Sequence, residues 1–209
     1  MSSLTLNERV VERAIAGLEE RTSAEVVVAV ANRSGDYRDA AWALACLTSL
    51  LYASVLILSP WFTVGEVPAL CSIAMLGALA FFLPLRFPSL ALALTSGETV
   101  RVAVDRAAKV AFVEEGVSAT EGRTGLLIFV SCLERQARVL PDLGLQGHFP
   151  EAEFANLERS LSLALQRGED LTSTLTAVLT TCGELLGTRT PRDPDDRNEL
   201  EDSIRWRMW

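Results

Sequence analysis

Residues 41–59 (AWALACLTSLLYASVLILS) and 67–85 (VPALCSIAMLGALAFFLPL) are two long apolar runs that lie close together in the chain. Neither run contains Asp, Glu, Lys or Arg, and Asp39 and Arg86 stand just outside them. About 20 apolar residues at 1.5 Å per residue match the roughly 30 Å hydrocarbon core of a bilayer. A charge at the centre of a membrane helix costs roughly 2.5 to 3.5 kcal/mol, so the flanking charges mark the helix ends. The two runs predict a transmembrane hairpin.

The alternative is a pair of helices buried in the core of a large soluble domain. Such a helix usually keeps a polar stripe on one side. These two runs contain only scattered Thr, Ser and Cys residues. The pattern therefore favours the membrane hairpin.

Basic residues predict the orientation of this hairpin. The link between the two runs contains Glu66 and no basic residue, whereas both flanks are basic: Arg33 and Arg38 before the first run, and Arg86, Arg101, Arg106 and Lys109 after the second. Flanks rich in Arg and Lys face the cytoplasm. We therefore predict a two-span protein of the inner (cytoplasmic) membrane with both termini in the cytoplasm. Because two spans return the chain to its starting side, the segments before and after them can pack together.

Composition limits the classes of partner. The chain has 209 residues and a formal net charge of −8. About 150 residues remain outside the membrane, which is enough for one domain with its own core. Nucleic-acid surfaces need clustered basic residues, so we predict no nucleic-acid partner. The expected partners are the lipid bilayer and another membrane protein.

Outside the hairpin, the sequence predicts an α/β domain. Residues 25–31 (EVVVAVA) and 125–131 (GLLIFVS) are apolar runs typical of strands covered on both faces, and residues 137–140 pair back as a third strand. Amphipathic helices are expected over residues 5–20, 99–115, 150–166 and 170–186, each with apolar residues on one face. This order predicts a three-layer α/β/α sandwich with the transmembrane hairpin inserted after the first strand.

The predicted domain boundaries follow from this order. Residues 1–39 form the first part of the α/β domain, and residues 95–187 form the second part. Residues 40–94 hold the hairpin and a short interfacial segment. Residues 188–209 are rich in Pro, Asp, Arg and Glu, so we expect a disordered tail. Its tip, residues 204–209 (IRWRMW), is either a loose end or a contact with the lipid headgroups.

Several short segments of the α/β part resemble the TPM domain family, which includes thylakoid acid-phosphatase-like proteins. They are residues 21–28 (RTSAEVVV), 124–130 (TGLLIFV), 134–135 (ER), 138–145 (RVLPDLGL), 167–170 (RGED) and 183–186 (GELL). The two spans after the first strand resemble a bacterial subgroup of that family. The resemblance implies a phosphatase activity, divalent-metal binding, or a role in the assembly or repair of membrane complexes.

Five charged residues are candidates for a ligand crevice: Glu25, Arg123, Glu134, Arg135 and Asp142. All lie at predicted strand ends or adjoining turns, where α/β sheets often bind ligands. By the family resemblance, Asp142 would help to bind Ca²⁺ or Mg²⁺, and Glu25 is the second candidate metal ligand. The alternative is that all five are solvated turn charges.

Two further residues carry catalytic hypotheses. Cys132 and Arg138 have the C-x5-R spacing of cysteine phosphatases, in which a thiolate attacks phosphorus. The five residues between them contain no glycine and lead into a strand, so we expect Cys132 to be a strand-end residue. His148, the one histidine, is expected on the surface rather than as a general base. No catalytic residue is assigned, and whether the chain is an enzyme stays open.

The sequence therefore leaves two functions. The favoured one is a membrane-tethered adaptor, or an assembly or maintenance factor for a membrane complex, because the chain has few catalytic residue types in one place. The alternative is a divalent-metal-dependent phosphatase that acts at the membrane surface.

Overall fold

The structure, a computed structural model, describes residues 6–59, 64–192 and 199–207. It contains two compact units. One unit joins Met1–Ser34 to Val102–Trp209, and the other is Gly35–Arg101. The first unit is thus built from both ends of the chain, and the second unit interrupts its sequence between Ser34 and Val102.

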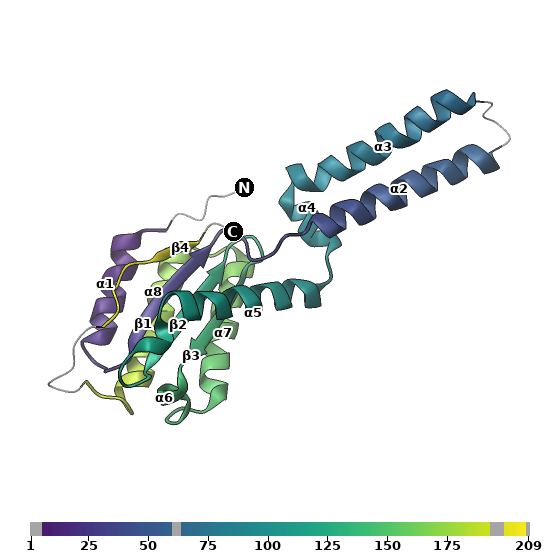
Figure 1. Ribbon diagram of the computed structural model, residues 1–209. Coiled ribbons are helices and arrows are strands. Elements are labelled where there is room, and N and C mark those ends of the chain that lie inside the picture. Colours follow the sequence, from purple (N-terminus) through teal and green to yellow (C-terminus); the bar gives the residue numbers. More distant parts are fainter. Residues whose placement is uncertain (1–5, 60–63, 193–198, 208–209) are drawn as a thin grey trace. The chain divides into compact units, whose positions relative to one another are not determined.

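A mixed sheet forms the centre of the first unit (Figure 1). Strands β1 (Glu25–Ala31), β2 (Gly125–Ser131), β3 (Gln136–Pro141) and β4 (Arg205–Arg207) lie in the order β3-β2-β1-β4. β1 pairs in parallel with β2 along its whole length and with β4 at its end, whereas β3 is antiparallel to β2. The predicted α/β fold is confirmed.

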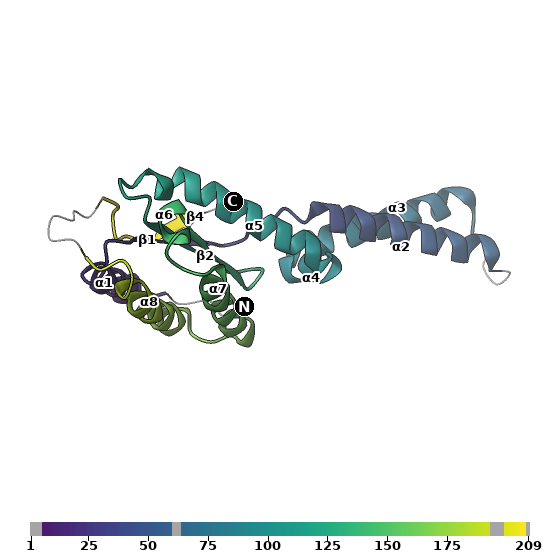
Figure 2. The same ribbon diagram turned by 90° about the horizontal axis from the view of Figure 1, so that it is seen from below.

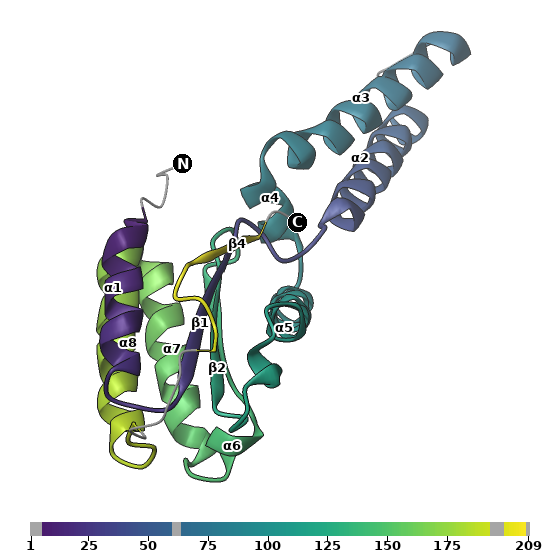
Figure 3. The ribbon, with the colours of Figure 1, turned by 60° about the vertical axis from the view of Figure 1, so that its left-hand side comes forward.

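Helices cover both faces of this sheet (Figures 2 and 3). Helices α1 (Glu8–Glu19), α7 (Glu151–Arg167) and α8 (Leu171–Gly187) lie on one face, and α5 (Gly97–Glu114) lies on the other. Alternate residues of β1 point to the two sides: Val26, Val28 and Val30 to the first, Val27, Ala29 and Ala31 to the second. Because both faces are covered, all seven positions of β1 are buried, which explains its unbroken apolar sequence.

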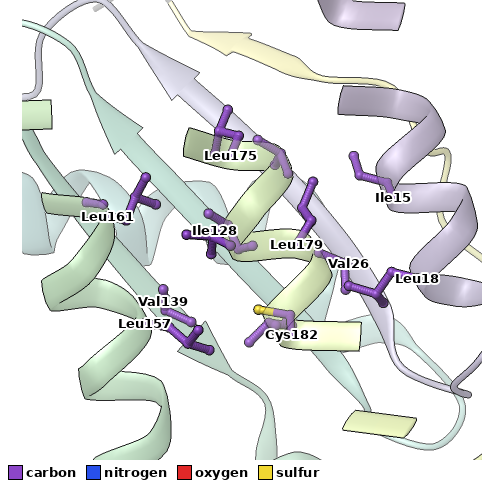
Figure 4. Packing of buried hydrophobic residues seen from close by; sticks show 14 of the residues in the cluster. Ile15, Leu18, Val26, Ile128, Val139, Leu157, Leu161, Leu175, Leu179 and Cys182 are labelled. Carbon is purple, nitrogen blue, oxygen red and sulfur yellow. The ribbon is translucent and has the colours of Figure 1, made fainter. Parts of the chain in front are cut away.

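The larger core joins segments far apart in the sequence (Figure 4). Ile15 and Leu18 of α1 pack with Leu179 and Cys182 of α8 over Val26 of β1. Burying one such aliphatic side chain contributes roughly 1.5 to 3 kcal/mol. The amino-terminal helix therefore belongs to the same globular unit as the helices that follow the insertion.

Short elements complete the first unit. The 3-10 helix η1 (Val117–Ala119) follows Gly116, whose φ of 70° ends α5 in the left-handed conformation. Helix α6 (Leu143–Gln146) follows β3. Asp170 caps α8, because its carboxylate accepts a hydrogen bond from the Ser173 amide at 2.9 Å.

The prediction of a disordered tail over residues 188–209 is wrong for the described part of that segment. Pro191 forms a bridge with Thr22, and Arg205–Arg207 form β4 beside β1. Three residues with two arginines carry no local strand pattern, so only pairing with the distant β1 defines this strand. Met208 and Trp209, the end of the predicted tip, lie outside the described residues.

The second unit consists of α2 (Arg38–Leu58), α3 (Glu66–Arg86) and the short α4 (Pro88–Leu94). α2 and α3 each have 21 residues and are long and apolar enough to cross a membrane. Only 11% of each apolar stretch is buried, whereas a core helix of a soluble protein is mostly buried. The predicted interfacial segment forms α4, which begins directly after Phe87.

Small residues let α2 and α3 approach each other closely. The buried positions are Ala41 and Ala45 on α2 and Gly77, Ala80 and Pro84 on α3. A Cβ atom at Gly77 would overlap the Ser49 side chain. Small residues are typical of helix contacts inside membranes, where packing rather than water exclusion holds helices together.

We predict that Gly77→Leu separates the two helices, because the new side chain has no space beside Ser49. Overpacking of this kind costs about 1 to 3 kcal/mol. The measurement is an SDS titration in mild detergent of a chain whose other three tryptophans are replaced by Phe. The titration is followed by the fluorescence of Trp42, whose ring centroid lies 4.5 Å from that of Phe81. Ala78→Leu, at the neighbouring exposed position, should keep the wild-type midpoint. Equal midpoints for both variants would contradict the close packing.

Candidate functional site

The structure does not bring the five candidate crevice residues together. Glu25, Arg123 and Asp142 lie at one end of the sheet, where β1 and β2 begin and β3 ends. Glu134 and Arg135 lie at the opposite end, in the turn between β2 and β3. The seven residues of β2 separate these two ends by roughly 20 Å. The predicted shared crevice is therefore wrong, because an antiparallel hairpin puts its turn and its open ends far apart.

At the first end, Arg123 holds Asp142 with two hydrogen bonds. Its Nε atom lies 2.6 Å from Oδ2, and its Nη2 atom lies 3.0 Å from Oδ1. Arg123 adopts a left-handed backbone with a φ of 53°, and its carbonyl accepts the Gly144 amide at 2.8 Å. A Cβ atom at Gly144 would collide with the carbonyls of Gly122 and Arg123. The pair thus fastens the turn before β2 to the end of β3.

This pairing sets the charge state of Asp142. The Arg123 guanidinium holds the pKa of the Asp142 carboxyl below its ordinary value, and the Leu143 amide lowers it further while burial opposes both. Asp142 is therefore ionised at neutral pH, with both oxygens engaged by the arginine fork. A divalent cation at this carboxylate would share it with Arg123, whose positive charge opposes the binding of a second cation.

Glu25, the second predicted metal ligand, is separated from Asp142 by β2. Its carboxylate is 4% exposed and accepts hydrogen bonds from the amides of Glu199 and Leu200, each at 3.3 Å. Across the residues that the structure describes, no three or more His, Cys, Asp or Glu side chains are grouped so that they could hold a metal ion.

Glu19 is a buried acid that the sequence reasoning missed. Its Oε1 atom accepts the Val26 amide at 3.0 Å. Burial, together with the neighbouring carboxylates of Glu25 and Asp202, raises the pKa of Glu19 to about 8, although the hydrogen bond from the Val26 amide lowers it. The available signal was its position four residues after Ile15, on the apolar face of α1.

At the second end, Glu134 closes the carboxyl ends of β1 and β2. It accepts a hydrogen bond from the Ser131 hydroxyl at 2.5 Å and one from the Ser34 amide at 2.9 Å. The hydroxyls of Ser34 and Ser131 lie 2.6 Å apart. Ligands often bind at this end of a parallel sheet, but here the acid is 6% exposed and joins the two strand ends.

Cys132 lacks the features of a phosphatase nucleophile. Burial raises the pKa of its thiol to about 11 from an ordinary value of 9.0, and Glu134 raises it as well. The reactive thiolate is therefore rarer at neutral pH than for an ordinary cysteine. Arg138, the arginine of the C-x5-R spacing, forms ion pairs with Asp105 at 3.8 Å and Glu158 at 3.5 Å. The positive charge of Arg138 is therefore paired with acids of α5 and α7.

His148 and Arg135 are surface residues. His148 is exposed, and its Nδ1 atom lies 2.7 Å from the Gly144 carbonyl oxygen. Arg135 is exposed in the turn after β2, with a left-handed φ of 51°. The expectation of a surface histidine agrees with this geometry.

A shallow groove of about 920 Å³ lies elsewhere, between α1 and the described end of the chain. Its lining comes from Arg9, Glu12, Arg13 and Ala16 on α1 and from residues 199–203. None of the predicted site residues lines this groove. The α1 wall carries two arginines and Glu12, and the opposite wall carries three acids; a shallow groove with such charges suits a polypeptide contact better than an enclosed reaction.

Comparisons with known proteins show the fold. Neither a scan against protein-family models nor a search of curated proteins gives a match. Among solved structures, the chain is similar to the NMR structure of the BA42 protein from the psychrophilic bacterium Bizionia argentinensis sp. nov.. The TM-score is 0.60 at 15% identity, and the match covers 99% of this chain and 100% of that one. At this identity the likeness concerns the fold alone.

We predict that Asp142→Asn lowers the free energy of unfolding by about 1 kcal/mol, a small value because Arg123 is half exposed. The wild-type contribution is present above the unfolded pKa of about 3.9 and is lost as pH falls through the lower folded pKa. Urea unfolding between pH 3 and pH 7 measures both effects, and the variant should lack this part of the acid dependence.

The matched control is Glu98→Gln, which removes an acid that also receives two hydrogen bonds from an arginine, Arg101. Both side chains of that pair are 66% exposed, so the change should leave the free energy of unfolding nearly unaltered. Equal effects of the two substitutions would show that the Arg123–Asp142 pair has no special structural weight.

Proposed function

We propose that this chain is an inner-membrane protein whose TPM-like α/β domain stands in the cytoplasm as a tethered adaptor, or as an assembly or maintenance factor for a membrane complex. The observation that carries the proposal is that the acidic candidates are engaged in structural contacts, while the thiol candidate Cys132 is partly buried. Asp142 is held by Arg123, Glu25 by two backbone amides, and Glu134 by Ser131 and Ser34. These contacts favour a binding role over catalysis.

The membrane tether is supported by chain order. α2 and α3 leave the α/β domain after β1 and return before α5, so they lie in the crossover between two paired strands. A helix of 21 residues is about 30 Å long. Both flanks carry arginines, and the residue that begins α3 is Glu66, so the positive-inside rule favours cytoplasmic termini.

The alternative is a divalent-metal-dependent phosphatase with Asp142 and Glu25 as metal ligands. It is favoured by the TPM resemblance and by the burial of three carboxylates at the start of the sheet: Glu19, Glu25 and Asp142. Hard divalent cations prefer such oxygen ligands. Because Arg123 neutralises Asp142, we place this function second.

We predict that carbonate washing leaves the protein in the membrane, and that the link faces the outside of the inner membrane. Single cysteines at Val64 and Val113, both exposed, report the two sides in a chain whose native cysteines are replaced. An impermeant maleimide should label Val64→Cys in spheroplasts and Val113→Cys only after permeabilisation. Release of the protein by carbonate would contradict the membrane tether. Labelling of Val113→Cys, and not of Val64→Cys, in spheroplasts would contradict the predicted orientation.

For catalysis, we predict that the purified full chain in detergent hydrolyses a generic aryl phosphate no faster than buffer, with or without Mg²⁺ or Ca²⁺. The reason is that a metal ion must compete with Arg123 for Asp142. Metal-dependent turnover that is abolished by Asp142→Ala and kept by Glu98→Ala would establish the phosphatase instead.

A further inference from the structure

The outer edge of β1 is covered by the chain's own end (Figure 3). Residues 199–207 follow β1 from its start to its end. The amides of Glu199 and Leu200 bond to Glu25, the first residue of β1. Arg207 pairs with Ala31, the last residue, and its carbonyl accepts the Asn32 amide at 3.3 Å. Backbone pairing with β1 is confined to Ala29–Ala31, and the contact at the start of β1 is made through the Glu25 side chain.

Two arginines of this segment meet an acidic helix end. Arg205 and Arg207 lie opposite Ala29 and Ala31, whose side chains point to the α5 side of the sheet. The Arg205 Nε atom lies 3.3 Å from Oε2 of Glu115, and Arg207 pairs with both Glu114 and Glu115. Adjacent carboxylates at the carboxyl end of a helix are unfavourable beside its negative dipole end, so this place favours a bound cation.

The other side chains of the segment meet apolar positions and α1. Ile204 is 9% exposed and belongs to the larger core. Trp206 lies opposite Val30, is 47% exposed, and donates from Nε1 to Glu8 at 2.6 Å. The edge therefore accepts four consecutive residues with a defined chemistry: apolar, Arg, aromatic, Arg.

The chain's own segment pairs with only part of this edge. Asp202 adds a carboxylate beside Glu19 and Glu25, where burial and these neighbouring acids raise the pKa of Glu19 to about 8. Arg9, Glu12, Arg13 and Glu201 line the groove at the same place. Only three residues of the segment form a strand. The residues of the segment before β4 are held at this edge by side-chain contacts rather than by a backbone ladder.

We propose that the outer edge of β1 is a strand-addition site for an extended apolar-Arg-aromatic-Arg segment of a membrane-protein partner, and that β4 occupies the site until that segment displaces it. Strand addition uses backbone hydrogen bonds for affinity and alternate side chains for specificity. The proposal rests on the proposed adaptor function for its class of partner. Cytoplasmic segments beside membrane spans are rich in Arg and Lys, and Trp and Tyr gather at the interface, which is the chemistry of this edge.

The test uses the full chain in detergent and a fluorescent peptide with the sequence of residues 199–207 (ELEDSIRWR). In the chain, Arg205→Glu with Arg207→Glu sets like charges against Glu114 and Glu115 and displaces β4. A tethered segment competes as if at millimolar concentration, so the peptide should bind this variant about tenfold or more tightly than the wild type. A peptide with the same two substitutions should not bind.

The matched control is Arg159→Glu with Arg167→Glu, which makes the same charge change at exposed positions of α7 and should bind the peptide as the wild type does. If the first variant does not fold, Ile204→Ala weakens the segment through the core and should give the same order of affinities. No binding to a folded, displaced variant would make β4 a permanent strand and overturn the site.

A dimer that depends on Arg205 and Arg207 would show exchange of this segment between two copies and would overturn the assignment to another protein. The titration contains no bilayer and no partner. Its failure is therefore distinguishable from failure of the adaptor function, which the labelling and hydrolysis measurements address.

Discussion

The parallel pairing of β1 with β2 determines how the other elements of the chain must be connected. All seven residues of β1 have a partner in β2, from Glu25 with Gly125 to Ala31 with Ser131. Parallel neighbours require a crossover connection, and in this chain the crossover contains α2 and α3. If these helices cross a membrane, an even number of crossings is required, because a single one would leave β2 on the opposite side from β1. The apolar hairpin and the buried sheet are therefore linked, because β1 and β2 can pair only if the hairpin returns the chain to the side from which it left.

The same pairing explains why polar groups gather at the ends of the strands. Each face of β1 is filled by aliphatic side chains, so the buried acids lie at the strand ends. Glu25 and Asp142 engage backbone amides or an arginine at one end, and Glu134 engages Ser131 and Ser34 at the other. A buried carboxylate without such partners would be costly. The hydrogen bonds therefore explain these acids without a catalytic role.

Local patterns in the sequence define most of the fold but little of the candidate site. The apolar runs of β1 and β2 and the charge-free runs of α2 and α3 depend on neighbouring residues, so they are readable from the sequence. The end of the sheet at which each of Arg123 and Glu134 lies depends on the β2–β3 hairpin, which places the two residues at opposite ends. Glu19 could have been found as an acid on the apolar face of α1. β4 could not, because Arg205–Arg207 become a strand only through the edge of β1.

The outer edge of β1 is also the part of the sheet that strand pairing covers least completely. On the other side of the sheet, β3 is joined to β2 by a tight turn and ion-paired to α5 and α7 through Arg138. Beside β1, by contrast, the sheet ends with three residues that arrive from the end of the chain, next to a groove that carries both charges. An exposed strand edge is a template for pairing and is normally covered. Covering it with a segment of defined chemistry protects the fold and also specifies which other segment can take its place.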